Sequence, residues 1–325
     1  MTTTITRRTA LAGFSALAMA SARAPALAQS GGVITMLHGF TPGANVDITA
    51  RLVADNLSKR LGRTVVVETR PGAGGTISAA AVARSAPDGS TIAILPSGHA
   101  VSAAMRKQLS YDAVEDFSFI SMLTENPFIF VTYPDHPAKT IADLIKAAQE
   151  APGKLTCATA GIGTGMHLAF ELFASMAKVK IQHVPYRGSP QAITDLIAKR
   201  VDFQVDTPQL LLPYLSDGRV RALAVTGPSR FFAQPNVPTV AESGLAGYSV
   251  TGWLGLAGPA GLPPDFVSKV NAEVKSILAD PAVVARLRAL GAEMVPTTPE
   301  AFRARVASDV AKWKKVVADA NIPRV

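Results

Sequence analysis

The chain has 325 residues and a formal net charge of +8, with 48% hydrophobic and 17% charged residues. This length allows two ordinary domains with well-packed cores. The basic residues are scattered and are not interleaved with aromatic residues, which argues against nucleic-acid binding. The single cysteine, Cys157, can form no internal disulfide and lies in an apolar run, so we expect a small buried core residue.

The first 28 residues have the features of an export signal peptide. Arg7 and Arg8 precede the apolar stretch Ala10–Ala20, which is too short to span a bilayer, and the small-residue site Ala26-Leu27-Ala28 follows. We expect cleavage before Gln29 and a mature protein in the periplasm. The paired arginines favour the twin-arginine (Tat) route over the Sec route, although the residues after them match a Tat signal only in part. Three positive charges lie in the signal, which leaves the mature chain at +5.

After the signal, short apolar runs alternate with amphipathic segments. We predict strands at Val33–Leu37, Thr64–Val67 and Thr91–Leu95, and helices at Val46–Leu61 and Ile77–Ala86. Apolar side chains at helical spacing support the first of these helices. An alternation of strands and helices predicts a parallel sheet with right-handed crossovers.

The middle of the chain repeats this alternation, and the last third is mainly helical. The further predicted strands are Phe128–Thr132, Leu155–Ala160, Ile181–Val184, Phe203–Val205 and Arg221–Gly227. The further predicted helices are Ile141–Glu150, His167–Ala177, Pro190–Lys199, Pro264–Ala279, Pro281–Leu290 and about Pro299–Ala320. We therefore predict an α/β protein with two Rossmann-like lobes. Residues 29–125 and 226–325 form the first lobe, and residues 126–225 form the second. Ligands of such sheets bind outside the carboxyl ends of the strands, so we expect a ligand cleft between the lobes.

A glycine-rich loop, Ala160–His167, joins a predicted strand to a predicted helix. Gly161 and Gly163 have the spacing of a dinucleotide loop, but Met166 stands where a third glycine is needed, and the next strand supplies no acid for a ribose. Backbone N–H groups and a helix N-terminus can still bind a small anion, and Thr164 can cap that helix or offer its hydroxyl to a ligand. We predict a carboxylate site, and a plain tight turn is the alternative interpretation.

Loops of the same character occur at Gly39–Asp47, Arg70–Gly75 and Pro96–His99. Longer segments carry a more specific pattern: GFTPGANVDITARLVADNLSKRLGRTVVVETRPGAGGTISAAAVARSAPDGSTIAIL, AGIGTGMHLAFELF, HVPYRGSPQAITDLIAKRVDFQVD, GRVRALAVTG and VPTVAESGLAGY. In these segments, which follow in order over nearly all of the mature chain, the sequence resembles the Bug-type substrate-binding proteins of tripartite tricarboxylate transporters.

The resemblance implies a type II periplasmic-binding-protein fold that closes on a small carboxylated solute. In that family, backbone N–H groups and hydroxyls of the second lobe hold the ligand carboxylate, and ordered waters and a first-lobe loop complete the site. The residues that inherit these roles are Ala160, Gly161, Gly163, Thr164 and His167 in the second lobe, Phe40, Thr41, Asn45 and Asp47 in the first-lobe loop, and Ser97 and Asp206 at the cleft wall. The family's first loop is usually richer in proline and glycine, so Thr41 and Asn45 are departures that add polar side chains, and His38 is also unusual.

Several of these residues also have simpler interpretations. Asp47 either complements a helix N-terminus or orients the loop before it. Asp206 either caps a turn or accepts a hydrogen bond from a ligand, and His167 either donates to a ligand or only begins a helix. Arg70 and Arg187 are either anion partners or solvated loop charges.

The sequence gives little support for chemistry. The histidines are dispersed without metal-ligand spacing, and we expect no metal and no cofactor. There is no G-x-S-x-G motif, and the closeness of Ser97 and His99 in sequence does not establish a hydrolase, which is a distant alternative. We expect a monomeric receptor that holds a small mono- or dicarboxylate by neutral donors and passes it to integral-membrane transporter subunits. A ligand sensor that feeds a two-component signalling system is the closer alternative.

Overall fold

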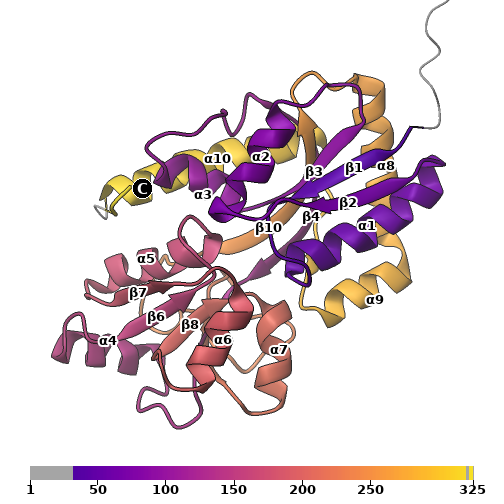
Figure 1. The fold of residues 1–325 in the computed structure, drawn as a ribbon. Coiled ribbons are helices and arrows are strands. Elements are labelled where there is room, and N and C mark those ends of the chain that lie inside the picture. Colours follow the sequence, from indigo (N-terminus) through magenta and orange to yellow (C-terminus); the bar gives the residue numbers. More distant parts are fainter. Residues whose placement is uncertain (1–31, 320–321, 325) are drawn as a thin grey trace, which may run out of the picture. The chain divides into compact units, whose positions relative to one another are not determined.

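Two sheets with their covering helices make up the fold in the computed structural model, which describes residues 32–319 and 322–324 (Figure 1). The predicted signal peptide, residues 1–28, and the start of the predicted mature chain lie outside these described residues. No helix in the described ranges has both the length and the apolar character needed to cross a membrane.

The first sheet has six strands in the order β11-β4-β10-β3-β1-β2. Its strands are β1 (Ile34–His38), β2 (Val65–Thr69), β3 (Thr91–Pro96), β4 (Phe117–Pro127), β10 (Thr251–Pro259) and β11 (Glu293–Met294). β1 pairs in parallel with β2 and β3, as predicted, but β10 is antiparallel to both β3 and β4. The prediction of a parallel sheet is therefore right for three strands and wrong for the whole sheet, which is mixed.

Strand β10 was missed because its sequence, TGWLGLAGP, is rich in glycine, which weakens a strand in isolation. The packing explains these glycines. A Cβ atom at Gly255 would lie only 2.1 Å from the ring of Phe302, and one at Gly258 would lie 2.5 Å from Leu262. The neighbouring strand β4 is buried on both faces along most of its length, so it has no polar–apolar alternation to predict it.

The helices of the first sheet agree with most of the predicted ones. They are α1 (Asn45–Leu61), α2 (Thr76–Ala83), α3 (Gly98–Met105), α8 (Pro264–Ala279), α9 (Pro281–Ala289) and α10 (Pro299–Asp319), and a short 3-10 helix, η1 (Ala73–Gly75), precedes α2. Helix α1 is terminated by the residue after it, Gly62, whose left-handed conformation (φ +64°) suits glycine. We call this sheet with its helices the first lobe.

The second sheet has five strands in the order β7-β6-β8-β5-β9. Its elements are β5 (Ile129–Thr132), α4 (Ile141–Glu150), β6 (Thr156–Thr159), α5 (Gly165–Ala177), β7 (Gln182–Pro185), α6 (Ser189–Ile197), β8 (Phe203–Asp206), α7 (Pro208–Ser216) and β9 (Arg221–Val225). β6 is parallel to β7 and β8, whereas β5 is antiparallel to β8 and β9. Cys157 is fully buried in β6, as predicted, and burial raises the pKa of its thiol. This sheet and its helices form the second lobe.

The chain crosses between the sheets at two points that are bonded to each other. The N–H of Phe128, between β4 and β5, donates to Thr226 Oγ1 at 2.8 Å, and the hydroxyl of Thr226 donates to the carbonyl of Val250 at 2.7 Å. Between these crossings, the hydroxyl of Tyr248 donates to the carbonyl of Ala169 in α5 at 2.8 Å. The segment 226–250 therefore packs on the second lobe before the chain returns to the first sheet as β10.

Candidate functional site

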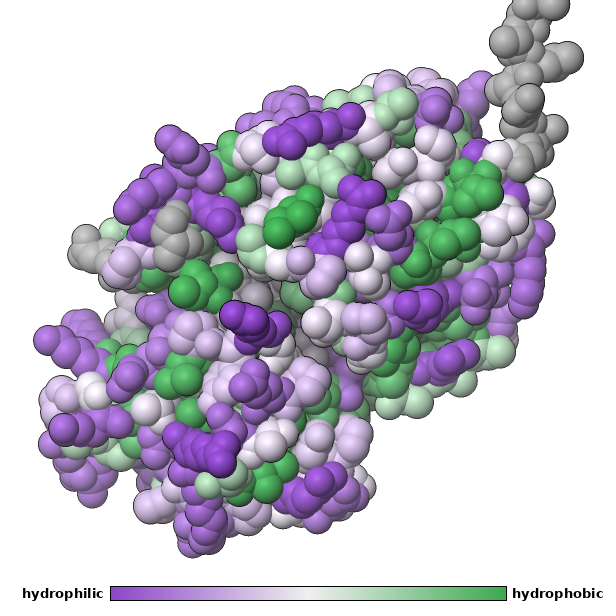
Figure 2. Space-filling model, viewed as in Figure 1, coloured by the Kyte–Doolittle hydropathy of each residue, from purple (hydrophilic) through white to green (hydrophobic). Residues whose placement is uncertain are grey.

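A cleft with a volume of about 1120 Å³ is lined by residues of both lobes. Figure 2 shows the surface hollowed between the part that carries β1–β3 and the part that carries β6–β8. Its walls are built from the loops that follow the carboxyl ends of β1, β3, β6, β7 and β8. This is the edge at which open α/β sheets bind their ligands.

Five helices begin at this cleft, two from the first lobe and three from the second. The first residues of α1, α3, α5 and α6 line it, and so does Thr207, which directly precedes α7. A helix N-terminus presents unpaired N–H groups and carries about half a positive charge. The cleft therefore collects partial positive charge from both lobes, and this favours an anionic ligand.

The second-lobe loop 160–164 presents its backbone to the cleft. Gly161 and Gly163 have φ angles of +130° and +79°, which side chains rarely adopt. The hydroxyl of Thr164 donates to the carbonyl of Gly161 at 2.8 Å and accepts from the N–H of His167 at 3.2 Å, so both of its functions are used within the loop. The hydroxyl thus caps α5, and it is the backbone that remains for a ligand.

The start of α5 supplies free donors at this point. Gly165 and Met166 line the cleft, and their N–H groups have no hydrogen-bond partner within the part of the chain that the structure describes. Two adjacent unpaired N–H groups at a helix N-terminus form a ready site for one carboxylate.

The first-lobe loop between β1 and α1 is held from behind by Asp47. Asp47 is buried, and its Oδ2 accepts the N–H of Gly43 at 2.9 Å, while its Oδ1 lies 3.1 Å from His38 Nε2 and 2.9 Å from an Arg51 nitrogen. Burial opposes ionisation of Asp47, but hydrogen bonds from Arg51, Gly43 and His38 outweigh it and lower its pKa. Two interpretations of Asp47 were open. The bond to Gly43 supports the one in which Asp47 orients the loop before α1.

Asp206 has the same position behind the second-lobe wall. It lies at the end of β8, is fully buried, and accepts hydrogen bonds from Ser189 Oγ (2.9 Å), the Thr207 N–H (2.8 Å) and Gln204 Nε2 (2.8 Å). Burial raises its pKa in spite of these bonds. Because Ser189 and Thr207 line the cleft, Asp206 acts on the cleft wall through them.

The predicted site residues thus lie in two layers. Those that line the cleft are Phe40, Thr41, Asn45, Ser97, Ala160, Gly161 and Thr164. Those that lie directly behind it, bonded to lining residues or to their loops, are Asp47, Gly163, His167 and Asp206.

Gln209 is a cleft residue that sequence reasoning missed. Both polar atoms of its side-chain amide are buried without a hydrogen-bond partner among the described residues, and the residue lines the cleft. Unpaired buried amide atoms are costly, which suits a group that a ligand pairs with. The available signal was the proline after Thr207, because proline at the first position of a helix marks a helix start after β8.

Three arginines also reach the cleft, although the sequence shows no arginine cluster. Arg106 donates to the carbonyl of Ala73 at 2.7 Å, and Arg219 pairs with Asp217 at 3.0 Å. Arg187 is exposed at the cleft and forms no ion pair with any described residue. They come from separate segments, so spacing along the chain could not group them. Arg70 instead pairs with Glu68 at 2.7 Å and does not line the cleft.

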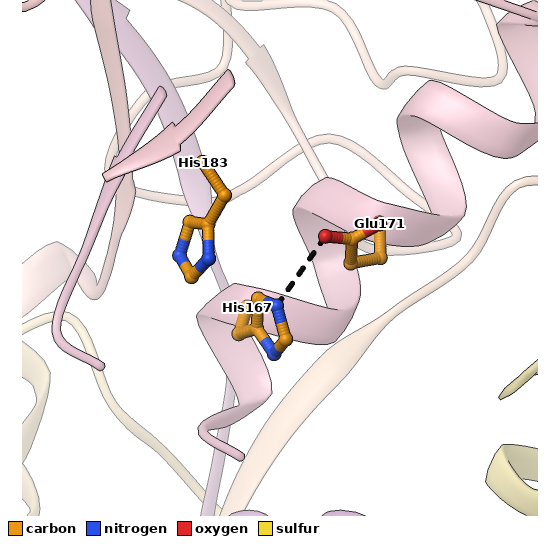
Figure 3. A group of neighbouring side chains, drawn as sticks. All are labelled: His167, Glu171 and His183. Carbon is orange, nitrogen blue, oxygen red and sulfur yellow. Dashed lines mark ion pairs between the residues drawn. The ribbon is translucent and has the colours of Figure 1, made fainter. Parts of the chain in front are cut away.

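A group of metal-ligating side chains, His167, Glu171 and His183, lies behind the second-lobe loop (Figure 3). The two imidazole rings are stacked 4.3 Å apart with their planes 22° from parallel. The nitrogen lone pairs of nearly parallel rings do not converge on one point, and His183 Nε2 is engaged with Thr159 Oγ1 at 2.7 Å. Zinc requires its ligands at about 2.0–2.2 Å in tetrahedral directions. The arrangement therefore fits a hydrogen-bonded network and does not fit a metal site.

The Ser97–His99 pair does not form a nucleophile and its base. His99 Nε2 lies 2.8 Å from the carbonyl oxygen of Ala113, and the ring stacks on Tyr111 at 5.6 Å. Burial lowers the pKa of His99 to about 4. The imidazole lies in the core of the first lobe. It is therefore not placed to act as the base that a nucleophilic Ser97 would need.

Comparison with known proteins finds relatives that cover most of the chain. Residues 49–322 match the family described as "Tripartite tricarboxylate transporter family receptor". BugT of Bordetella pertussis is 33% identical over 286 residues, which cover 87% of this chain and 88% of BugT. The structure of Rpa4515 of R. palustris with adipate has a TM-score of 0.86 and 32% identity, and the match covers 90% of this chain and 99% of that one. MatC (Rpa3494) from Rhodopseudomonas palustris with bound malate has a TM-score of 0.82 and 32% identity, with 88% and 99% covered.

Proposed function

Because the chain belongs to the family of tripartite tricarboxylate transporter receptors, we propose that it binds a small organic carboxylate in the cleft and delivers it to integral-membrane subunits of such a transporter. It acts as a monomer in the periplasm, to which the signal peptide of residues 1–28 directs it, and it carries out no chemistry. The arrangement of His99 supports the last point, because the cleft serine nearest to it in sequence lacks a base.

The observation that carries the proposal is the start of α5. Gly165 and Met166 line the cleft at the positive end of a helix of 13 residues, and their N–H groups are unpaired among the described residues. One carboxylate can accept from both groups without a countercharge nearby. Gln209, with both amide atoms unpaired, then serves a second polar group of the same ligand.

The ligand class is a mono- or dicarboxylate. Rpa4515 and MatC, whose structures contain adipate and malate, support this choice because both compounds are dicarboxylates. If one carboxylate binds at α5, Arg187 is available for a second one, because it is exposed at the cleft and forms no ion pair with any described residue. The other two cleft arginines are already engaged, Arg106 with the carbonyl of Ala73 and Arg219 with Asp217.

Closure of the two lobes follows from the same site. The lobes approach backbone to backbone: a Cβ atom at Gly98 would lie 3.3 Å from the carbonyl oxygen of Gly163, and one at Gly74 would lie 3.2 Å from that of Ile162. A ligand that contacts both lobes favours the closed form, and a membrane partner can distinguish that form from the open one.

A thermal-shift screen of the mature chain, residues 29–325, tests the proposal. The panel contains adipate, malate, citrate, amino acids and aromatic acids. A micromolar ligand at millimolar concentration stabilises a protein by about 4 kcal/mol, so a true ligand gives a clear rise in Tm. A response to mono- or dicarboxylates is the expected result. If no acid raises the Tm, and mass spectrometry of the denatured protein finds no retained solute, the receptor proposal is wrong.

A further inference from the structure

A buried histidine lies behind the first-lobe cleft loop. His38, at the end of β1, is fully buried, and its Nε2 lies 3.1 Å from Asp47 Oδ1. Its other ring nitrogen, Nδ1, accepts the N–H of Phe40 at 3.4 Å. The ring therefore joins a buried carboxylate to the backbone of the residue that begins the cleft wall, since Phe40 and Thr41 line the cleft.

The second-lobe loop has the same arrangement of a buried histidine between a carboxylate and a loop N–H, built from a different part of the sequence. His167, in the first turn of α5, is buried, and its Nε2 lies 3.3 Å from Glu171 Oε1 (Figure 3). Its Nδ1 accepts the N–H of Gly163 at 3.4 Å. The bond turns this N–H inward, away from the cleft, in a loop whose Gly161 and Thr164 line it.

The chemistry of imidazole makes the two contacts of each ring mutually dependent. A neutral imidazole has one N–H and one lone pair, and an ionised carboxylate can only accept. With Nε2 donating to the carboxylate, Nδ1 must carry the lone pair and can accept the loop N–H. The carboxylate thus selects the tautomer that the loop requires, as a partner of one ring nitrogen commonly does for the other.

We propose that His38 and His167 are positioning residues for ligand binding, each of which holds one cleft loop in its binding conformation through an acceptor at Nδ1. The inference rests on the proposed function for its binding readout. Neither ring touches the cleft, so each acts by limiting the conformations of a loop that must otherwise be ordered when the ligand binds.

His136 provides a matched control elsewhere in the second lobe. It is also buried, its Nδ1 accepts the N–H of Ala138 at 3.1 Å, and its Nε2 lies 3.8 Å from Asp202 Oδ1. None of these residues lines the cleft. A substitution at His136 therefore removes a similar pair of contacts without affecting either cleft loop.

Two substitutions separate the two functions of the ring. The amide oxygen of asparagine can replace Nδ1 as an acceptor, whereas the amide nitrogen of glutamine replaces Nε2 as a donor and leaves the loop N–H without its partner. The experiment uses the mature chain with His38→Asn, His38→Gln, His167→Asn, His167→Gln and His136→Gln. NMR first measures the imidazole tautomers and the hydrogen exchange of the Phe40 and Gly163 amides without ligand, and calorimetry then measures adipate affinity.

We expect the Nε2–H tautomer for both histidines in the wild-type protein. In each glutamine variant, the amide of the affected loop should exchange about two- to tenfold faster and adipate affinity should fall by a similar factor, which is what the loss of one hydrogen bond allows. The asparagine variants should stay close to wild type, and His136→Gln should change neither quantity.

The inference is overturned if either ring is in the Nδ1–H tautomer, or if the glutamine variants match the asparagine variants in amide exchange. If the wild-type protein does not bind adipate, the choice of ligand in the proposed function is at fault, and the tautomers and the amide exchange still decide the present inference.

Discussion

The two cleft loops both line the cleft, but they present different chemical groups to it. The second-lobe loop 160–164 uses backbone: its glycines adopt positive φ angles, and its one hydroxyl, on Thr164, is consumed in capping α5. The first-lobe loop presents the side chains of Phe40, Thr41 and Asn45 to the cleft, and its backbone is tied to Asp47.

This difference suggests a division of labour. Backbone N–H groups recognise any carboxylate, because they read only charge and geometry. We expect side chains such as Thr41 and Asn45 to contact the rest of the ligand. Changes in the second-lobe loop should therefore reduce affinity for every carboxylate, whereas changes in the first-lobe loop should alter the preference among them.

The largest expected effect on ligand affinity comes from valine at a glycine with positive φ in each loop. Gly163 and Gly43 have φ angles of +79° and +81°, so the intrinsic strain of Gly163→Val and Gly43→Val is matched. Such strain amounts to about 1–3 kcal/mol. We expect Gly163→Val to lower adipate affinity about a hundredfold, because the loop must leave its anion-binding conformation. Gly43→Val, whose Cβ has open space around it, should lower affinity by less than about tenfold.

Calorimetry measures both affinities, and a cooperative thermal transition by circular dichroism verifies that each variant is folded. A larger loss in the Gly43 variant would move the carboxylate site to the first lobe.

The acid stability of the two lobes gives the next effect. Burial lowers the pKa of His99 in the first lobe to about 4, and burial, helped by His167, lowers that of His183 in the second lobe to about 3. Below pH 6.5 the unfolded chain takes up protons that the folded protein does not. The free energy of unfolding should therefore fall as the pH drops from 6.5 toward 4, by about 1.4 kcal/mol per pH unit for each such histidine.

Urea denaturation between pH 6.5 and 4.5 measures this slope. His99→Phe and His183→Phe should each make it less steep. An unchanged slope in both variants would mean that other groups account for the acid sensitivity.

Loss of a polar side chain from each wall gives a smaller effect. We expect Gln209→Leu to weaken adipate binding about tenfold, since Gln209 lines the cleft and both of its amide atoms lack hydrogen-bond partners among the described residues. Asn45→Leu should weaken it less, because Asn45 Oδ1 already accepts from Thr49 at 3.4 Å. The ratio of adipate to malate affinity should change more in the Asn45 variant. Equal ratios in the two variants would contradict the proposed division of labour.

The smallest effect on stability concerns the aspartate behind each wall. The pKa of Asp47 is lowered and that of Asp206 is raised, so at neutral pH the charge stabilises the fold at the first position and costs stability at the second. We expect Asp47→Asn to lower the free energy of unfolding by about 1–2 kcal/mol. Asp206→Asn should change it by less than about 0.5 kcal/mol, because the unpaired Oε1 of Gln204 can accept from the new amide. Denaturant titration at pH 7 compares them, and a larger loss at Asp206 would show that its charge is favourable where it lies.

The sequence by itself determined the parts of this protein that depend on neighbours along the chain. Helix α1, helix α8 and strand β3 were predicted to within a residue or so at each end, because apolar periodicity and the flanking glycines and prolines act over a few positions. The tight turn at Gly161–Thr164 was predicted for the same reason, since its φ angles are properties of single residues, whereas its binding of an anion stays a prediction.

Only the tertiary structure decided how distant segments combine. β10 lies antiparallel between β3 and β4 because its glycines admit the ring of Phe302 and the side chain of Leu262, neighbours that the local sequence does not reveal. Gln209 and Arg187 join the cleft because α7 begins there and the loop after β7 ends there. The tertiary structure also decided which residues line the cleft and which support it from behind, as His38, Asp47, His167 and Asp206 do. Burial and hydrogen-bond direction depend on what packs behind each loop, and the local sequence does not reveal this.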